Sequence, residues 1–190
     1  DQSHLLPPEQ VTKLRKRVEE ANRAVDPIRL ARRLVDREML TGWQARQLLA
    51  GRNAFYLGRY KLLDRLGKGG MGVVFRAEHT VMDRIVALKV MSPELLRRES
   101  AVTRFNREVK AAAALNHANI IVAFDADCVG NTHFLVMECV EGHDLNTWLR
   151  KKGPFPVSAA CECAMQTAEG LQHAYHKEMV HRDIKPVNLL

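Results

Sequence analysis

Three polar residues near the end of the 190-residue chain can do acid–base and metal chemistry. They lie in the stretch HRDIKPVN, residues 181–188. The Asp183 carboxylate can accept a proton from an attacking hydroxyl, and the Lys185 ammonium can neutralise a transferring phosphoryl group. The Asn188 side chain can coordinate a metal ion. The alternative is a polar surface turn that contains Pro186.

A glycine-rich stretch, LGKGGMGVV at residues 66–74, can close over phosphate groups. Gly67, Gly69 and Gly72 have the spacing G-x-G-x-x-G, and Val74 extends it to G-x-G-x-x-G-x-V. Glycines let a strand–turn–strand segment present backbone N–H groups to phosphate oxygens. The pattern alone is weak, because a glycine-rich hairpin can be only a turn. A strand rather than a helix is predicted after it, which argues against a Rossmann dinucleotide site.

A lysine in an apolar strand provides a third candidate. Lys89 lies in VALKV, where its ammonium needs an anion to offset desolvation. Glu108, in the predicted helix that follows, is a candidate partner. Such a pair would hold the ammonium against the α- and β-phosphates of a nucleotide. The alternative is an exposed lysine at a strand edge.

These motifs occur in an order that resembles a known family. The stretch from Tyr60 to Leu190 is similar to the first part of a eukaryotic-type protein kinase domain, and most similar to bacterial serine/threonine kinases of the PknB kind, which share the GGMG tip. We therefore expect an N-terminal fragment that ends in the catalytic loop. No segment of the Asp-Phe-Gly type follows Asn188 in these residues, so we expect the fragment alone to be inactive.

The resemblance implies a site for ATP and Mg²⁺. Leu66 and Val74 would enclose adenine with Ala87 above it, and Met137 would be the gatekeeper. Glu138 and Val140 would offer backbone hydrogen bonds to adenine. Asp144 would lie near the ribose. The set implied for ATP is Leu66, Gly67, Lys68, Gly69, Gly70, Met71, Gly72, Val73, Val74, Ala87, Lys89, Glu108, Met137, Glu138, Val140 and Asp144.

The same resemblance assigns the catalytic residues. Asp183 would be the catalytic base, Lys185 would act beside it, and Asn188 would be a metal ligand. Lys185, two positions after Asp183, favours serine or threonine hydroxyls of protein substrates over tyrosine. Arg182 suggests control by activation-loop phosphorylation. Cys139 replaces a common aromatic residue of the hinge, which changes the lining of the predicted pocket but not its backbone contacts.

The elements that must position these residues follow a change of pattern near Tyr60. Five strands are predicted in the segments 60–69, 72–79, 84–91, 120–129 and 132–140, with one helix inserted at residues 100–116. A short helix near 141–153 and a long one at 157–177 follow. We expect an α+β, protein-kinase-like fold with a five-stranded antiparallel N-lobe (59–137), a hinge (138–142) and the start of a helical C-lobe (143–190).

Residues 1–58 lie outside the resemblance and are predicted to form a small all-helical leader and linker. Val11, Leu14, Val18 and Ala21 recur at helical spacing. Asp26 precedes Pro27 as an N-cap, and Thr41 and Gln44 have capping-box spacing in a third helix that ends at Gly51. The leader is either a small bundle or lies on a larger neighbour. We expect it to be separable from kinase activity.

Composition argues against a zinc-binding protein and against a membrane-spanning segment within these residues. The chain has a net charge of +7, of which residues 1–58 carry +4, and its four cysteines match no zinc ligand set. We expect reduced thiols in a cytoplasmic protein. No apolar run is long enough to span a bilayer, although a transmembrane segment downstream is left open.

Four functions remain to be weighed. The first is an ATP-dependent serine/threonine protein kinase in signalling. The second is a nucleotide-binding pseudokinase or scaffold, against which the intact Lys89, Glu108, Asp183 and Asn188 argue. A basic leader that binds nucleic acid is disfavoured, because the leader has no interleaved aromatic residues. A small-molecule phosphotransferase is disfavoured by Lys185. The family resemblance also leaves room for a kinase dimer.

Overall fold

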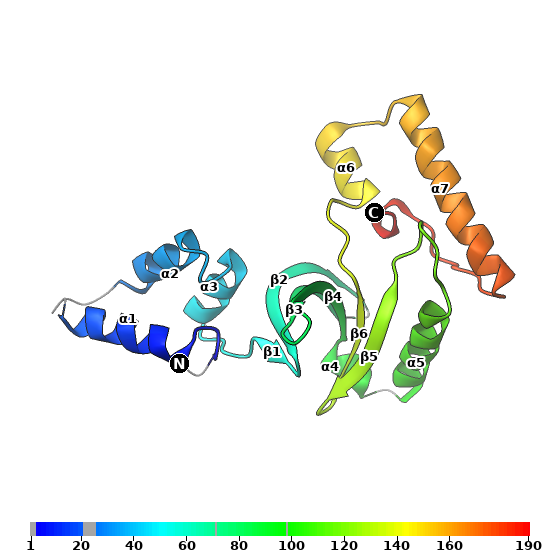
Figure 1. Ribbon diagram of the computed structural model, residues 1–190. Coiled ribbons are helices and arrows are strands. Elements are labelled where there is room, and N and C mark those ends of the chain that lie inside the picture. The colour runs from blue at the N-terminus through cyan, green and yellow to red at the C-terminus, as the bar shows by residue number, and fades with distance from the viewer. Residues whose placement is uncertain (1–2, 21–25, 71, 98) are drawn as a thin grey trace. The chain divides into compact units, whose positions relative to one another are not determined.

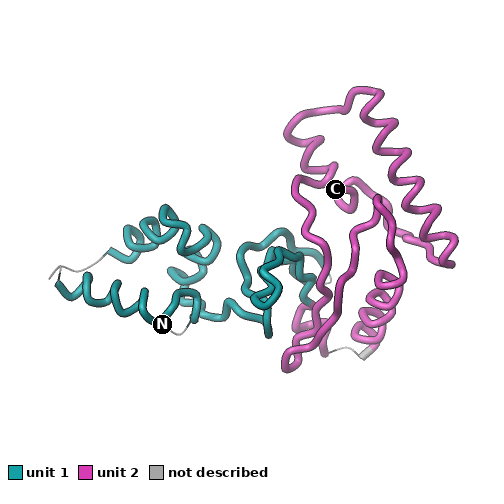
Figure 2. Tube along the Cα trace, in the orientation of Figure 1, with its two compact units in different colours: residues 1–90 teal, residues 91–190 magenta. Residues whose placement is uncertain are grey.

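The computed structural model describes residues 3–20, 26–70, 72–97 and 99–190. The chain divides into two compact units, residues 1–90 and residues 91–190 (Figure 2). Ala21 and Met71, both named in predictions above, lie outside the described residues.

The first unit begins with three helices, α1 (Pro8–Glu20), α2 (Pro27–Asp36) and α3 (Gly42–Leu49) (Figure 1). Their starts follow from local chemistry. The Asp26 carboxylate accepts a hydrogen bond from the Ile28 N–H at 2.9 Å, and Pro27 occupies the first turn, where its missing N–H costs nothing. In α3 the Thr41 hydroxyl and the Gln44 side chain form the predicted capping box. All three predicted helices are therefore confirmed.

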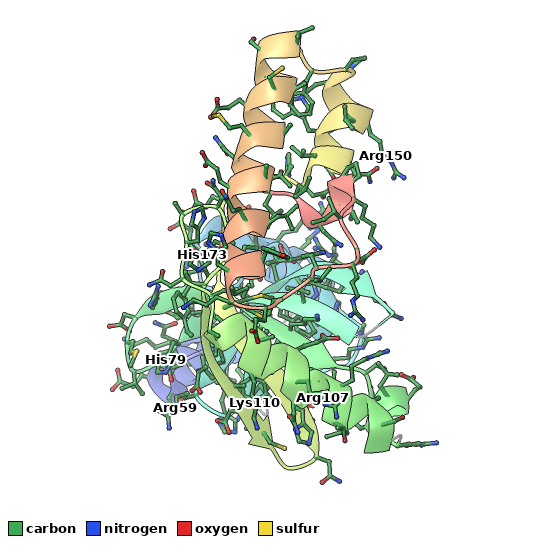
Figure 3. The ribbon with its side chains drawn as sticks, turned by 90° about the vertical axis from the view of Figure 1, so that its right-hand side faces the viewer. Arg59, His79, Arg107, Lys110, Arg150 and His173 are labelled. Carbon is green, nitrogen blue, oxygen red and sulfur yellow. The ribbon has the colours of Figure 1, made fainter. Side chains whose placement is uncertain are left out.

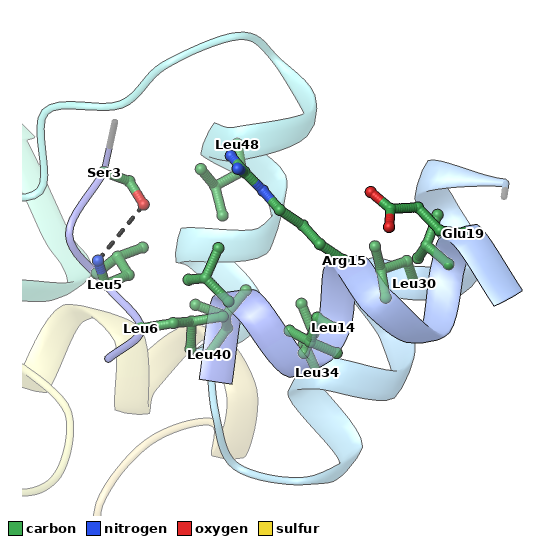
Figure 4. Close-up of a pocket in the computed structure, with 12 residues that line it drawn as sticks. Ser3, Leu5, Leu6, Leu14, Arg15, Glu19, Leu30, Leu34, Leu40 and Leu48 are labelled. Carbon is green, nitrogen blue, oxygen red and sulfur yellow. Dashed lines mark hydrogen bonds between the residues drawn. The ribbon is translucent and has the colours of Figure 1, made fainter. Parts of the chain in front are cut away.

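The apolar faces of these helices share one core. Leu5, Leu34, Leu40 and Phe55 are buried together, with leucines of all three helices packed around them. A cavity of about 300 Å³ lies beside this core, lined mainly by leucine and valine side chains, with Arg15 and Glu19 also in its lining (Figure 4). No residue predicted to bind ATP lines this cavity.

Four strands complete the first unit: β1 (Tyr56–Leu57), β2 (Tyr60–Gly69), β3 (Gly72–His79) and β4 (Arg84–Met91), whose last residue falls in the second unit. They are neighbours in that order, and β2 is antiparallel to both β1 and β3. Three consecutive residues of β4, from Val86 to Leu88, are buried, which is typical of a strand covered on both faces.

The end of the β2–β3 pair away from its glycines is held by His79. Its ring meets the Tyr60 ring edge-on at 4.9 Å, and its Nδ1 accepts hydrogen bonds from the N–H groups of Val81 and Met82. The Arg59 carbonyl accepts two further hydrogen bonds, from the N–H and the hydroxyl of Thr80. His79 and Arg59 are labelled in Figure 3. These contacts fix the turn that leads into β4.

The second unit contains α4 (Pro93–Leu96), α5 (Glu99–Ala113), the hairpin of β5 (Ala123–Val129) and β6 (Thr132–Glu138), α6 (Leu145–Lys152), α7 (Val157–His176) and a 3₁₀ turn, η1 (Pro186–Asn188). Its core joins Met91, Ala101, Phe105 and Leu135. The β5–β6 hairpin is antiparallel and turns at Gly130, whose φ of +59° suits glycine.

The predicted strands and helices are all present, with small corrections at their ends. The helix predicted to end at Gly51 ends at Leu49, and the helix predicted over 100–116 ends at Ala113. The sequence did not lead us to expect β1, α4 or η1. All three have four residues or fewer, too short for a hydrophobic period to reveal them.

Candidate active site

The glycine-rich segment joins β2 to β3 as the sequence predicts. Gly67 lies opposite Val74, Lys68 opposite Val73, and Gly69 opposite Gly72. A Cβ atom built on Gly67, Gly69 or Gly70 would meet no atom within 4 Å. The backbone of this segment is therefore open to a ligand, as phosphate binding by main-chain N–H groups requires.

The strands around the glycine segment carry the residues predicted to meet adenine. Leu66, at the register shift between Arg65 and Gly67, is half exposed. Val74 is partly buried and Ala87, on β4, is buried. Small and branched apolar side chains of this kind suit the face of an aromatic base.

Lys89 follows the buried Leu88 on β4 and is itself partly buried. Glu108 lies on α5, where its Oε1 is 3.9 Å from the Arg104 Nε one turn earlier. The two predicted partners belong to different units. The Lys89–Glu108 ion pair therefore stays a prediction.

The hinge segment begins where β6 ends. The Glu138 N–H donates to the Val122 carbonyl at 2.9 Å, and the Glu138 carboxylate accepts from the Val122 N–H at 3.4 Å. Because the Glu138 N–H is used within the protein, a hydrogen bond from this residue to adenine would use its carbonyl oxygen. Met137 is partly buried and Val140 is exposed.

Asp144, predicted to lie near a ribose, is the N-cap of α6. Its Oδ1 accepts from the Thr147 N–H at 2.9 Å, and its Oδ2 accepts from the Thr147 hydroxyl at 2.7 Å. These hydrogen bonds lower the pKa of the Asp144 carboxyl. The sequence interpretation missed this role, although the Asp-x-x-Thr spacing before a helix is a recognised cap signal.

The three residues of the predicted catalytic loop lie together. The Lys185 ammonium is 2.9 Å from the Asp183 Oδ1. The Asn188 side-chain amide donates to the Asp183 carbonyl at 2.8 Å and to its Oδ2 at 3.1 Å. Pro186 starts the 3₁₀ turn that brings Asn188 back toward Asp183. The three side chains therefore converge, and their catalytic role stays a prediction.

The Asp183 carboxylate is held in its ionised form. The Lys185 hydrogen bond is the largest cause that lowers the pKa of Asp183, and the hydrogen bond from Asn188 lowers it further. An ionised carboxylate at neutral pH is the state that a general base needs. The preceding Arg182 has a φ of +63°, an uncommon conformation for a side chain of that size.

The catalytic loop is tied to the helices of its own unit. The Leu145 N–H, at the start of α6, donates to the Leu189 carbonyl at 2.8 Å. Farther along, α7 contacts the loop after α5, where the Asn119 amide donates to Glu169 at 2.8 Å. In the same region the centroid of the His173 ring lies 5.1 Å from that of the His117 ring. His173 is labelled in Figure 3. These contacts anchor the helix that leads into residues 181–188.

Magnesium is the metal that this oxygen-rich loop would suit. Asn188, the predicted ligand, offers an amide oxygen, and Mg²⁺ binds oxygen ligands. Among the described residues there is no group of three or more His, Cys, Asp or Glu that could hold a metal ion. The loop therefore supplies only part of a coordination sphere. The described part of the chain also has no helix long and apolar enough to cross a membrane.

Comparisons with known proteins agree on one family. The family description "Protein kinase domain" matches residues 60–190. The chain is 36% identical over 133 residues to the serine/threonine-protein kinase PrkC of Bacillus subtilis, a match that covers 70% of this chain and 20% of PrkC. It is 40% identical over 141 residues to PksC of Streptomyces coelicolor, covering 70% of this chain and 25% of PksC. The chain thus spans only 20–25% of these curated relatives.

A solved structure gives the same result. The PknI kinase domain of Mycobacterium tuberculosis matches with a TM-score of 0.61 and 28% identity, covering 70% of this chain and 54% of that one. This similarity confirms the predicted kinase-like fold, with a curled antiparallel sheet and helical segments that form a partial kinase domain. The relatives of this chain are bacterial serine/threonine kinases. The chain belongs to the protein kinase family.

Proposed function

We propose that this chain is the nucleotide-binding and catalytic-loop part of an ATP-dependent serine/threonine protein kinase that acts in signalling. The observation that carries the proposal is the convergence of Lys185 and Asn188 on an ionised Asp183 carboxylate. Family membership supports the ATP-dependent chemistry, and the names of the relatives support serine or threonine as the acceptor.

Each residue has a stated task in this proposal. Asp183 would accept the proton of the substrate hydroxyl as that oxygen bonds to the γ-phosphorus, and the bond from the γ-phosphorus to the bridging oxygen would break to release ADP. Lys185 offsets negative charge beside the reacting centre, and Asn188 holds Asp183 in place and offers its amide oxygen to magnesium. Bound MgATP supplies the phosphoryl group and the metal charge that makes transfer favourable.

The nucleotide would be held by the open backbone of the glycine segment and by Lys89. Main-chain N–H groups of residues 67–74 would face the phosphate oxygens, and the Lys89 ammonium would neutralise the α- and β-phosphates. Leu66, Val74, Ala87 and Met137 would enclose adenine. The carbonyl of Glu138 and the N–H of Val140 would give the base its orientation.

A polypeptide of these 190 residues alone should bind ATP without transferring phosphate. Asn188 is the single metal ligand assigned within it, and a Mg²⁺ ion that bridges phosphates needs more than one protein ligand in this chemistry. Phosphate transfer by a longer polypeptide that contains these residues would separate the kinase from the alternative. A pseudokinase or scaffold would bind nucleotide in every context and transfer phosphate in none.

The proposal is tested in the gene product that contains these residues, incubated with MgATP and a general protein substrate. We expect phosphoserine and phosphothreonine, and a loss of transfer of about 10²–10⁴-fold in Asp183→Asn, because an amide cannot accept the hydroxyl proton. Asp127→Asn is the matched control, since the Asp127 carboxylate accepts only from the neighbouring Cys128 N–H among the hydrogen bonds resolved here. Equal transfer by Asp183→Asn and the parent would overturn the assignment.

A further inference from the structure

The third helix of the leader contacts the strand that leads into the glycine segment. Within the first unit, the Gln44 side-chain amide donates to the Leu62 carbonyl at 2.7 Å. The Thr41 hydroxyl donates to the Leu63 carbonyl at 2.5 Å. Both acceptors are main-chain atoms of β2, and both donors belong to the capping box of α3.

These two carbonyls lie at an irregularity of β2, where Leu63 has no paired residue on β3. Leu62 pairs with Ala77 but the next paired residue is Asp64, opposite Arg76, so Leu63 is an extra residue in the ladder. On the other side, β1 extends only over Tyr56–Leu57, and the Leu62 N–H donates to Phe55 just before it. Carbonyls left without a partner at a bulge or sheet edge must be satisfied from elsewhere.

The capping box therefore has two tasks. The Gln44 Oε1 accepts from the Thr41 N–H at 2.9 Å, and the Thr41 Oγ1 accepts from the Gln44 N–H at 3.1 Å, which closes the first turn of α3. The Thr41 hydroxyl and the Gln44 side-chain NH₂ group donate to the main chain of β2. Gln44 is only 2% exposed, and a buried amide that lost either partner would carry a desolvation cost.

Aromatic packing reinforces the same junction. The Trp43 ring meets Phe55 edge-on, with centroids 5.9 Å apart, and meets Phe75 of β3 at 5.7 Å. Phe75 lies opposite Arg65, two residues before Gly67. One turn of α3 thus contacts both strands that carry the glycine segment.

We propose that Gln44 and Thr41 are positioning residues for the nucleotide: they fix the bulge in β2 and through it the path of the glycine segment. This inference rests on the proposed kinase function, because it assigns the leader a role in ATP binding. It also revises our expectation that the leader is separable. Removing residues 1–52 would leave the Leu62 and Leu63 carbonyls without these donors.

The test compares Gln44→Glu with Gln47→Glu in the 190-residue chain. Glutamate at 44 can still accept from the Thr41 N–H, so the helix cap survives, but in its ionised form it cannot donate to the Leu62 carbonyl. Gln47 is one turn later on α3 and accepts from Arg52, away from β2, so its change to glutamate is a matched control. Circular dichroism establishes that each variant is folded.

Two readouts are measured on folded protein: amide hydrogen exchange in residues 61–74 without nucleotide, and the Kd for MgATP. We expect Gln44→Glu to speed exchange there and to weaken ATP binding by about tenfold, the equivalent of one lost hydrogen bond of about 1.4 kcal/mol. Gln47→Glu should change neither. Parental exchange and parental affinity in folded Gln44→Glu would overturn the inference.

A second pair of variants covers the case in which Gln44→Glu does not fold. Thr41→Ser keeps the hydroxyl and should behave like the parent, whereas Thr41→Val should show faster exchange and weaker binding. Equal behaviour of the two would overturn the inference. If the parent chain binds no ATP, the proposed function fails, but the exchange measurements still decide whether α3 positions the glycine segment.

Discussion

The glycine segment and the catalytic loop are held in place by different kinds of contact. The strands of the glycine segment are held by residues distant in sequence: Gln44 reaches Leu62 across 18 positions and is almost fully buried. The side chains of the catalytic loop are exposed, 61% for Asp183 and 50% for Lys185, and their contacts join residues within five positions of one another.

The difference explains which parts of the site can be recognised from sequence. A loop whose groups converge through local hydrogen bonds carries its geometry in one short motif, so HRDIKPVN is informative alone. A phosphate-binding segment needs a fixed backbone, and its support can come from residues that no local motif identifies. Substitutions in the two regions can test this contrast.

Apart from Asp183→Asn, the largest effect is expected at Lys89, the one charged residue on β4 that is assigned to the phosphates. In the gene product that contains this chain, Lys89→Met should reduce phosphotransfer by about 10²–10³-fold while the fold is kept, because a preorganised charge at the phosphates is lost. Lys61→Met on β2 is the control. The rate of autophosphorylation provides the measurement, and near-parental autophosphorylation would contradict the assignment.

The leader core should contribute more to stability than the surface of the catalytic loop. Leu34→Ala should lower the free energy of unfolding by about 2–3 kcal/mol, at the low end for a buried leucine because a cavity already lies beside it. Val187→Ala, at a half-exposed site, should change it by less than about 0.5 kcal/mol. Urea unfolding measures both, and equal losses would remove the contrast between the two regions.

A smaller effect is expected at the cap of α6. Asp144→Ala should lower stability by about 1 kcal/mol near neutral pH, whereas Asp144→Asn should retain most of it, because asparagine also caps helices. Hydrogen bonds from Thr147 lower the folded-state pKa of Asp144 below its ordinary 3.8. The extra stability of the carboxylate is therefore present above pH 3.8 and is lost as pH falls through the lower folded value.

Urea unfolding at pH 7 and at pH 3 tests this account of Asp144. The difference between the parent and Asp144→Asn should shrink at the lower pH. A difference that grows on acidification would mean that the Thr147 contacts do not hold the ionised form.

The smallest effect is a change in titration at the catalytic loop. Lys185→Met should raise the pKa of Asp183 toward its ordinary value, because the Lys185 hydrogen bond is the largest cause of the lowered value. Lys177→Met, just after α7, should leave it unchanged. Carboxyl carbon chemical shifts followed by NMR against pH report the pKa directly, and an unchanged value would mean that the pair at 2.9 Å does not persist in solution.

Most of the fold could be predicted because its elements carry strong local signals. Asp26 and Pro27 mark one helix start, and Gly130 marks a hairpin turn. The contact of α3 with β2 could not be predicted, since a capping box looks the same whether or not its spare donors bind a strand. The cap that Asp144 forms on α6 was not predicted, and its place near the ribose stays a prediction.

The central claim is that the glycine segment and the hinge segment both bind ATP. Amide hydrogen exchange of the 190-residue chain, with and without saturating MgATP, tests it most directly. We expect slower exchange on ATP addition in residues 67–74 and in residues 138–140, with little change in α1 and α2. Unchanged exchange in both segments of the folded chain at millimolar ATP would contradict it.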